Sequence, residues 1–357
     1  MNSARIRKLV SLIKKHKIDA LLITNPVSLR YFTGFGEEGC LALFKANSTI
    51  ILACSKMLYH QVCSEVKGGR VRVVLQKRLG DIVKAGKIKS LGFEQEYVSV
   101  GALGRLRKMI PRARLVGLDL VEQIRTIKDK VEIRLLRRSA HIVAQSYRRL
   151  LSWLNSGVSE FDLARKASEV MIEKGAEGVS FDPVIAFGSH GAFAHHVPSD
   201  KRFSKGAIAL IDMGCTYKRY ASDVTRTLVK GKGPSRKLKS GRNITYQEVY
   251  RIVLASQTEA IKKIKPGVPC RYVDKVARNV IEEAGLGEYF VHSTGHGIGM
   301  SVHERPSLAP KSKDVLLENM VVTVEPGVYI PGWGGVRIED MVLVTKRGHK
   351  VLSEIPK

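Results

Sequence analysis

The sequence predicts two domains of different class: an α/β domain over residues 1–125, and an α+β domain with an internal pseudo-twofold repeat over residues 126–357. The length of 357 residues favours two domains, since domains average about 150 residues. In the first part, short apolar runs alternate with helical stretches, which is typical of α/β domains. In the second part, the order helix–helix–strand–strand occurs twice.

The first domain is expected to begin with an amphipathic helix, because apolar residues such as Ile6, Leu9 and Ile13 follow helical spacing. Residues 19–24 then form a short buried strand, and residues 40–54 a pair of strands. The elements that follow are expected to be strands at 71–75, 90–93 and 114–117, and helices around 56–66, 78–86 and 100–109. Strands and helices alternating at this spacing indicate a largely parallel sheet.

The helices of the second domain are marked by their first residues. At three places in the sequence, a side chain that can cap a helix is followed three positions later by an acidic residue. These pairs are Asp129 with Glu132, Ser159 with Asp162, and Thr245 with Glu248. The expected helices run to about residues 154, 174 and 264, and a fourth covers 270–284 after the Pro266-Gly267 break.

Two pairs of β runs follow the two pairs of helices, at 207–213 with 222–228 and at 321–325 with 336–345. An ordinary α+β succession would give the same order, so the pattern alone does not establish a repeat. Residues 231–242 are rich in Gly, Ser and Lys and are expected to form a flexible loop.

The chain is strongly basic, with 60 Lys and Arg against 33 Asp and Glu and a net charge of +27. The excess is spread over both domains in short clusters that lack interleaved aromatic residues, and no zinc-finger, RRM or KH signature is present. A nucleic-acid partner is therefore possible but not favoured, and a solvated basic surface is the preferred interpretation.

The sequence predicts a cytoplasmic protein with no membrane partner. No apolar run approaches the roughly 18 residues that a membrane span needs. The basic first segment lacks the continuous apolar core of a secretory signal. The five cysteines are odd in number and form no CxxC, which argues against a disulfide framework or a structural zinc site.

Each β pair of the second domain carries two carboxylates at matching places. Asp212 ends a strand and Asp223 lies on the next one; Glu325 and Glu339 repeat this arrangement. A carboxylate that ends a buried strand is costly unless it is paired or bound to a metal. Surface ion pairs with the abundant Lys and Arg remain the alternative for any one of them. If the two hairpins face each other, however, all four carboxylates converge.

Four converging carboxylates cannot all ionise without cations, because like charges raise one another's pKa. Two divalent ions would balance their charge, and a set of oxygens with one imidazole favours Mn²⁺ or Co²⁺. The imidazole candidate is His296, in HSTGHGIG, with His292 as its competitor. We expect the glycines around His296 to permit a sharply turned backbone and the close approach of a ligand.

Two further histidine sites lie in polar loops: His195 with His196 in GAFAHHVPSDKR, and His303 in VHERP. A loop histidine near a proline is often only a surface residue. Beside a dinuclear site, these histidines could bind a substrate carbonyl or stabilise an oxyanion.

Four segments together resemble the M24 "pita-bread" metallopeptidases, in the branch of aminopeptidase P and prolidase. They are AHHVPSDKR, IDMGCTYKRYASDVTRT, HSTGHGIGMSVHERP and VTVEPGVYIPGWGGVRIED. The resemblance covers nearly the whole chain, since IDALLITNPVSLRYFTGF is similar to the creatinase-type N-terminal domain. It implies a creatinase-like domain over residues 1–125 and a pita-bread catalytic domain over residues 126–357.

The resemblance also implies a role for each candidate residue. The implied metal ligands, with Asp223 and Glu339 bridging two ions, are Asp212, Asp223, His296, Glu325 and Glu339. His195, rather than His196, matches the histidine that contacts the substrate or the tetrahedral intermediate. His303 matches the histidine that holds the scissile carbonyl. Arg337 is expected to orient the cluster and to contribute to substrate binding.

The implied reaction is hydrolysis of the bond before proline by a hydroxide bridging two cations, with Glu325 passing a proton to the leaving nitrogen. Many prolidases carry an arginine that would grip the terminal carboxylate of a dipeptide, at the place where this chain has Ser307. Arg305, two residues earlier, or a residue of another subunit could take over as the substrate anchor. The sequence nevertheless favours an Xaa-Pro aminopeptidase acting on longer peptides over an Xaa-Pro dipeptidase. A non-catalytic member that binds nucleic acid or protein is a more distant alternative. The resemblance also implies a homodimer.

Overall fold

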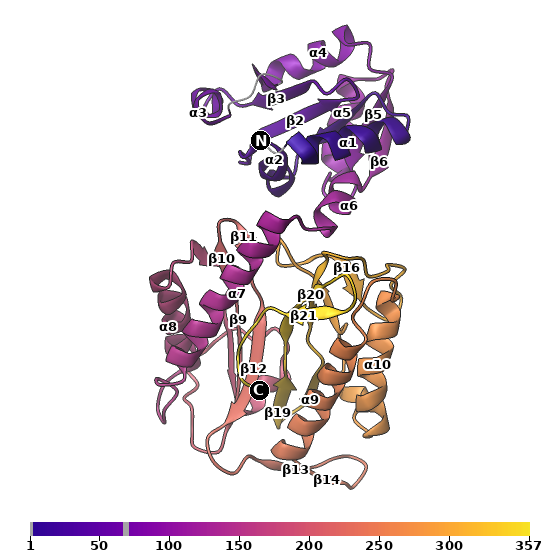
Figure 1. The fold of residues 1–357 in the computed structure, drawn as a ribbon. Coiled ribbons are helices and arrows are strands. Elements are labelled where there is room, and N and C mark those ends of the chain that lie inside the picture. Colours follow the sequence, from indigo (N-terminus) through magenta and orange to yellow (C-terminus); the bar gives the residue numbers. More distant parts are fainter. Residues whose placement is uncertain (1–2, 67–70) are drawn as a thin grey trace. The chain divides into compact units, whose positions relative to one another are not determined.

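The computed structural model describes residues 3–66 and 71–357, and the chain divides into two compact units, Met1–Arg125 and Thr126–Lys357 (Figure 1). Each unit has its own sheets and its own buried apolar clusters. Within the described ranges, none of the helices combines the length and apolar character that crossing a bilayer requires.

The first unit is built on a six-stranded sheet in the order β4-β3-β2-β1-β5-β6. Three pairings, β3–β4, β1–β5 and β5–β6, are parallel, whereas β2 is antiparallel to both β1 and β3. The expected largely parallel sheet is therefore a mixed one. The cause is the short connection between β2 and β3, which only antiparallel neighbours can have. The strands are β1 Ala20–Ile23, β2 Cys40–Lys45, β3 Ile50–Cys54, β4 Val71–Leu75, β5 Ser90–Glu94 and β6 Arg114–Leu118.

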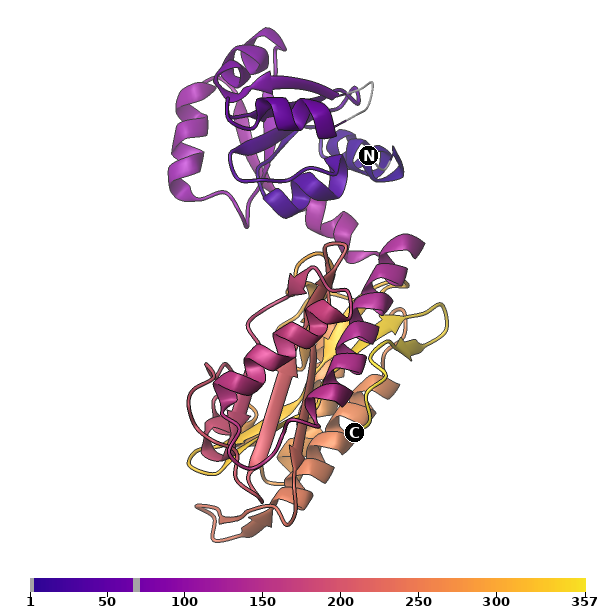
Figure 2. The ribbon, with the colours of Figure 1, turned by 90° about the vertical axis from the view of Figure 1, so that its left-hand side faces the viewer.

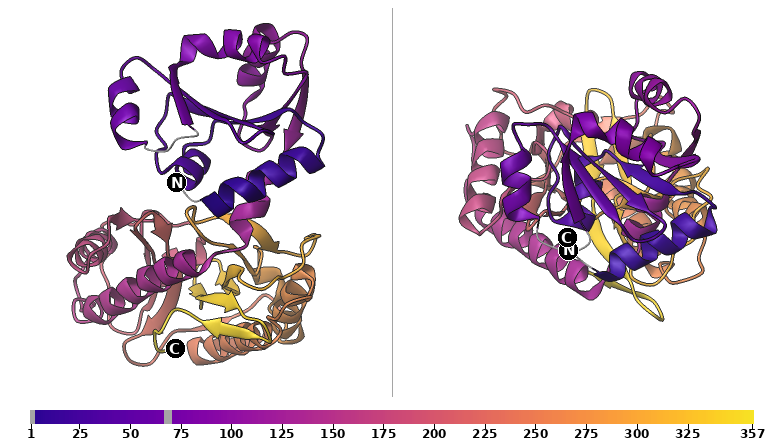
Figure 3. Two further views of the ribbon diagram at one scale, coloured as in Figure 1. Left: turned by 45° about the horizontal axis from the view of Figure 1, so that its top comes forward. Right: turned by 90° about the horizontal axis from the view of Figure 1, so that it is seen from above.

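Helices cover both sides of this sheet (Figure 3). The predicted first helix is present as α1, Ser3–Lys15, and buries its apolar residues. Helix α2, Pro26–Thr33, was not predicted, although Asn25 caps it and Pro26 opens it. The other helices are α3 Tyr59–Glu65, α4 Leu79–Ala85, α5 Val100–Met109 and α6 Leu120–Thr126, the last also unpredicted.

The second unit has two pairs of helices, α7 and α8 on one side of its strands and α9 and α10 on the other (Figures 1 and 2). The predicted capping box at Asp129 and Glu132 is present, and Ser159 and Thr245 accept the predicted N-cap hydrogen bonds. Sequence and geometry therefore agree on where these helices begin. The helices are α7 Lys130–Leu150, α8 Glu160–Glu173, α9 Tyr246–Lys262 and α10 Cys270–Glu283.

Two sheets form the centre of this unit, one in the order β12-β9-β8 and the other in the order β16-β15-β17-β20-β21. Their strands are β8 Val184–Phe187, β9 Ile208–Met213, β12 Val224–Val229, β15 Gly295–Gly297, β16 Glu304–Leu308, β17 Val321–Val324, β20 Asp340–Val344 and β21 His349–Val351. Smaller pairings involve β7 Gly178–Val179, β10 Cys215–Tyr217, β11 Tyr220–Ala221, β13 Ser235–Lys237, β14 Asn243–Thr245, β18 Gly327–Ile330 and β19 Gly334–Arg337.

Two expectations about these strands were wrong. The segment 231–242, expected as a flexible loop, contains β13, which pairs with β14. The run 336–345 is not one strand, because it is interrupted at Ile338 and Glu339 between β19 and β20. Glu339 therefore lies in a break between strands rather than on a strand.

The hairpins β9–β12 and β17–β20 are joined by hydrogen bonds between their edges. Glu339 N donates to Thr225 O at 3.1 Å, and Thr227 Oγ1 exchanges hydrogen bonds with the backbone of Arg337. Arg226 reinforces this junction, since its guanidinium bonds Asp340 at 2.7 Å and the backbone oxygens of Ile355 and Pro356. Both side chains of the Arg226–Asp340 pair are buried.

Replacing Arg226 by methionine should lower the free energy of unfolding by about 3 kcal/mol. Asp340 then loses one of its cationic partners, Lys357 being another, and the carbonyl oxygens that Arg226 bonds lose their donor. Thermal and denaturant unfolding of the purified chain would measure the loss. Arg251→Met is the control, since Arg251 is exposed on α9. If the two variants were equally stable, the buried pair would not hold the hairpins together.

Candidate functional site

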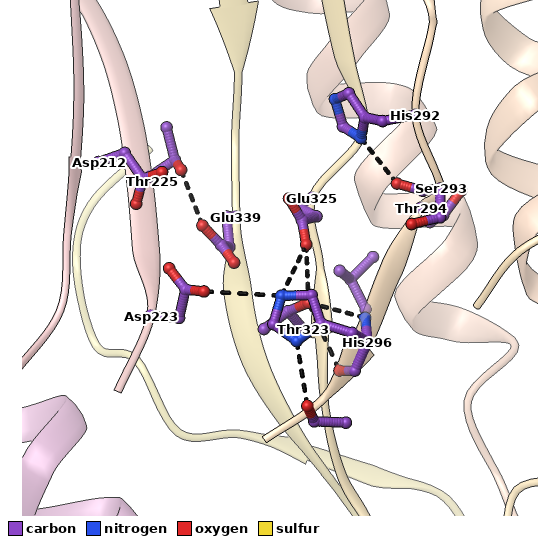
Figure 4. Close-up of polar contacts among 12 residues, drawn as sticks. Asp212, Asp223, Thr225, His292, Ser293, Thr294, His296, Thr323, Glu325 and Glu339 are labelled. Carbon is purple, nitrogen blue, oxygen red and sulfur yellow. Dashed lines mark hydrogen bonds and ion pairs between the residues drawn. The ribbon is translucent and has the colours of Figure 1, made fainter. Parts of the chain in front are cut away.

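Four carboxylates meet between the two hairpins (Figure 4). Asp212 lies on β9 and Asp223 directly before β12, while Glu325 follows β17 and Glu339 precedes β20. Because Val324 pairs with Asp340, Glu325 and Glu339 extend the β17–β20 hairpin at opposite positions. All four residues line one cavity. The arrangement is not the surface ion pairing that was the alternative for each acid, since Asp212, Asp223 and Glu339 are buried.

His296 on β15 points its Nε2 into this cluster, 3.2 Å from Glu325 Oε1 and 3.6 Å from Asp223 Oδ2 (Figure 4). Ligand atoms of Asp223, His296 and Glu339 all lie within 4.8 Å of one another. His296 Nδ1 is 3.0 Å from Gly297 O, so a neutral ring that donates from Nδ1 leaves Nε2 free to coordinate.

The glycines beside His296 serve a different purpose from the one expected. Neither Gly295 nor Gly297 has the positive φ of a sharp turn. A Cβ on Gly295 would lie 2.0 Å from Thr323 O, and one on Gly297 would lie 2.2 Å from Arg305 O. These glycines therefore allow the adjacent strands to pack closely against β15, which fixes where His296 points.

Crowding separates the pKa values of these groups. Burial, followed by the charge of a neighbouring carboxylate, raises the pKa of Asp223 and of Glu339 well above the ordinary range. Burial opposes the ionisation of Glu325, but the hydrogen bond and charge of His296 outweigh it and lower its pKa to about 2. Burial also opposes the charging of His296, yet Glu325 raises its pKa to about 9.

The donor set fits divalent cations. Asp212 Oδ1 and Glu339 Oε1 are buried without a hydrogen-bond partner among the described residues. Buried oxygens of this kind are costly unless something binds them. Four carboxylates and one imidazole offer the mainly oxygen ligands, with one nitrogen, that suit ions such as Mn²⁺ and Co²⁺.

A second layer of side chains orients the cluster. Thr225 Oγ1 donates to Glu339 Oε2 at 2.7 Å and accepts from Arg337 Nε at 2.9 Å. Arg337 also donates to Asp212 Oδ2 at 2.6 Å and to the Tyr329 hydroxyl at 2.7 Å. Arg337 therefore contacts the cluster that it was expected to orient, and its role in substrate binding stays a prediction. Tyr329 was missed, because a tyrosine after an EPG segment carries no recognisable signal.

His292, the competitor for the imidazole position, makes different contacts. Its Nδ1 is 2.8 Å from Ser293 O, and its Nε2 is 2.8 Å from the Tyr329 hydroxyl. Burial lowers the pKa of His292. The ring lines the cavity but is engaged with Tyr329, while His296 faces the carboxylates.

The cavity above the cluster has a volume of about 460 Å³, within the range of small-molecule sites. His195 and His303 both line it, and the His303 ring centroid lies 4.3 Å from that of His296. His196 lines the cavity as well, but its Nε2 is 2.8 Å from Glu160. Arg305, considered as a substrate anchor, pairs with Asp314 at 2.6 Å and is not among the lining residues.

Comparison with known proteins covers both units. Metallopeptidase family M24 matches residues 134–346, and the creatinase/prolidase N-terminal domain matches residues 5–127. The chain is 36% identical over 353 residues to the Xaa-Pro dipeptidase of Pyrococcus horikoshii, covering 98% of this chain and 97% of that protein.

Solved structures are similar over the same extent. The Xaa-Pro dipeptidase from Bacillus anthracis is 35% identical with a TM-score of 0.90, covering 99% of this chain and 98% of that one. The X-Pro aminopeptidase from Thermotoga maritima is 34% identical with a TM-score of 0.88, covering 98% of each chain. The creatinase-type and pita-bread folds expected from the sequence are therefore confirmed.

Loading the metal-free protein with Mn²⁺ at pH 7 should release protons. His296, with its pKa raised to about 9, is protonated at that pH and must lose its proton to become a ligand. Glu325, with a pKa of about 2, is already ionised and contributes none. Calorimetric titration in buffers of different ionisation enthalpy measures the number released.

His296→Ala should release about one proton fewer, whereas His349→Ala, on the edge strand β21, should match the wild type. Cation binding with no proton released at pH 7 would contradict the assignment of His296.

Proposed function

The chain belongs to metallopeptidase family M24, and on this premise we propose that it is an Xaa-Pro dipeptidase that uses two divalent cations. The observation that carries the proposal is the cluster of four carboxylates and one imidazole that lines one cavity. Three of its acids are buried, and two of its oxygens have no hydrogen-bond partner among the described residues. Such a cluster binds cations rather than remaining charged alone. Family membership makes the chain a hydrolase, and the substrate class rests on its relatives.

The choice of a dipeptidase revises the preference drawn from the sequence. That preference favoured an aminopeptidase, because Ser307 stands where many prolidases carry an arginine. The similar proteins include Xaa-Pro dipeptidases, both in sequence and in structure, and one X-Pro aminopeptidase of comparable similarity. These relatives support the dipeptidase better, and the aminopeptidase becomes the second candidate.

In this proposal, the residues that would hold the cations are Asp212, Asp223, His296, Glu325 and Glu339. Asp223 and Glu339 would be shared between the two ions, and Mn²⁺ or Co²⁺ fits the donor set best. When bound, the two cations polarise the scissile carbonyl and lower the pKa of water toward neutrality.

The protein groups then supply positioning and proton transfer. His195 and His303, which line the cavity, would hold the carbonyl before proline and stabilise the negative charge that develops on its oxygen. Glu325 would take up, at Oε2, the proton that a water loses as its oxygen bonds to the carbonyl carbon, while Oε1 stays hydrogen-bonded to Thr323 at 3.0 Å. Glu325 would then deliver this proton to the proline nitrogen as the bond between that nitrogen and the carbonyl carbon breaks. Arg337 would hold Asp212 and Tyr329 in place.

Two further expectations remain proposals: a homodimer, and proline-containing peptides as the substrates. The non-catalytic alternative is not favoured, because every residue expected as a ligand is present. The charge of +27 would attract anionic peptides toward the molecule but has no assigned role in the reaction.

Protein stripped with a chelator and reloaded with Mn²⁺ should cleave Ala-Pro with a kcat/KM at least about tenfold above that for Ala-Pro-Ala, a difference of about 1.4 kcal/mol. Product release followed by chromatography measures both, and Ala-Ala is the control for the requirement for proline. The stripped protein should be inactive. A preference for the tripeptide would select the aminopeptidase, and undiminished activity after chelation would overturn the proposal.

A further inference from the structure

Glu160, the first residue of helix α8, is a fully buried carboxylate outside the cluster of expected ligands. Its oxygens accept hydrogen bonds from four residues of the segment 187–199. Oε1 accepts from Phe187 N at 2.7 Å and lies 2.9 Å from His190 Nδ1. Oε2 lies 2.8 Å from His196 Nε2 and accepts from Ser199 Oγ at 2.6 Å and Ser199 N at 3.1 Å.

Two interpretations of this group are possible, a metal site or an anchor. Glu160, His190 and His196 do offer three ligand atoms within 4.8 Å of one another. The carboxylate, however, already receives five hydrogen bonds, and an ionised carboxylate has about four lone-pair sites. Burial disfavours its charge, but these bonds outweigh burial and lower the pKa of Glu160. A satisfied carboxylate of this kind anchors its donors.

The anchored segment carries His195. It begins at the end of β8, continues through the short 3₁₀ turn Gly188–Ala192 and reaches Ser199. His196, next to His195, is held through its ring by Glu160. On the other side, the carbonyl oxygen of Ala194 accepts a hydrogen bond from Arg337 Nη1 at 3.3 Å. The residues on both sides of His195 are therefore hydrogen-bonded to buried charged side chains, Ala194 to Arg337 and His196 to Glu160.

The His195 ring itself lines the cavity, and no side chain or backbone group of the described residues hydrogen bonds to it. The backbone on either side therefore sets the position of His195 Cβ and the direction in which the side chain leaves the chain. The backbone of α8 adds two further ties, since Glu160 N donates to Lys201 O and Phe161 N donates to Ser199 O, both at 3.0 Å.

We propose that Glu160 is a positioning residue, which acts through His196, Ser199 and the backbone of this segment to aim His195 at the substrate carbonyl. The proposal rests on the role of His195 in the proposed function. Glu160 needs no contact with the substrate or the cations for this role. The role requires a carboxylate, since the groups that hydrogen bond to its oxygens are donors.

Two substitutions of Glu160 distinguish the effect of its negative charge from the effect of its side-chain length. Glu160→Gln keeps the length but replaces one acceptor oxygen with an NH₂ group, which would face donors such as Phe187 N or Ser199 N. Glu160→Asp keeps the acceptors but shortens the side chain by one methylene. Glu169→Gln is the matched control, because Glu169 lies on the same helix but is exposed and pairs with Arg165 and Lys166 of that helix.

The kinetic test is a double-mutant cycle on Ala-Pro with Mn²⁺. Glu160→Gln should lower kcat/KM by about 10- to 100-fold, and Glu160→Asp by less. In the His195→Ala background, Glu160→Gln should cause no further loss, because the side chain that it positions is gone. Glu169→Gln should match the wild type. Multiplied losses in the double variant, or wild-type activity in Glu160→Gln, would overturn the proposal.

A second measurement does not depend on activity and therefore separates this proposal from the proposed function. In ¹⁵N-histidine spectra of the Mn²⁺-free protein, Glu160→Gln should move the ring signals of His195, identified with His195→Ala. The signals of His303 should stay in place. An unmoved His195 signal would overturn the positioning role even in an inactive protein. If Glu160→Gln does not accumulate as folded protein, Glu160→Asp is measured in its place with the same expected direction.

Discussion

The structure of the second unit depends on one constraint: four carboxylates and one imidazole share a buried space between two β hairpins. Like charges so close together cannot all ionise in the absence of cations. The pKa values of the four acids accordingly differ. The pKa of Glu325 is lowered to about 2 beside His296, whose own pKa is raised to about 9, while the pKa values of Asp223 and Glu339 are raised. The buried guanidinium of Arg337, paired with Asp212, offsets part of the negative charge.

The surrounding elements hold the two hairpins so that the acids stay close together. Each hairpin contributes two acids, and the Thr225–Glu339 contact joins one hairpin to the other. Helices on the outer sides hold the hairpins in place, and α8 extends this support to the histidine segment through Glu160.

The sequence predicted the parts of the structure that follow from short-range patterns. Helix starts were readable from capping side chains such as Asp129, and the four acids from their repeated place after apolar runs. Strand pairing was less accessible. The mixed first sheet and the β13–β14 hairpin depend on which strands pair, and composition and spacing do not show this. At the break between β19 and β20, Glu339 N donates to Thr225 O, a partner distant in the sequence. Tyr329 and Glu160 were missed because their roles arise only when remote segments meet.

The most direct test of this account is the number of cations that the cluster holds. Equilibrium dialysis of the stripped protein against Mn²⁺, followed by elemental analysis, counts the bound ions per chain. The account predicts two in the wild type and fewer in Glu339→Gln, which lacks one charge at the shared position. A wild type that binds no more than one ion, or a Glu339→Gln variant that binds two with unchanged affinity, would contradict it.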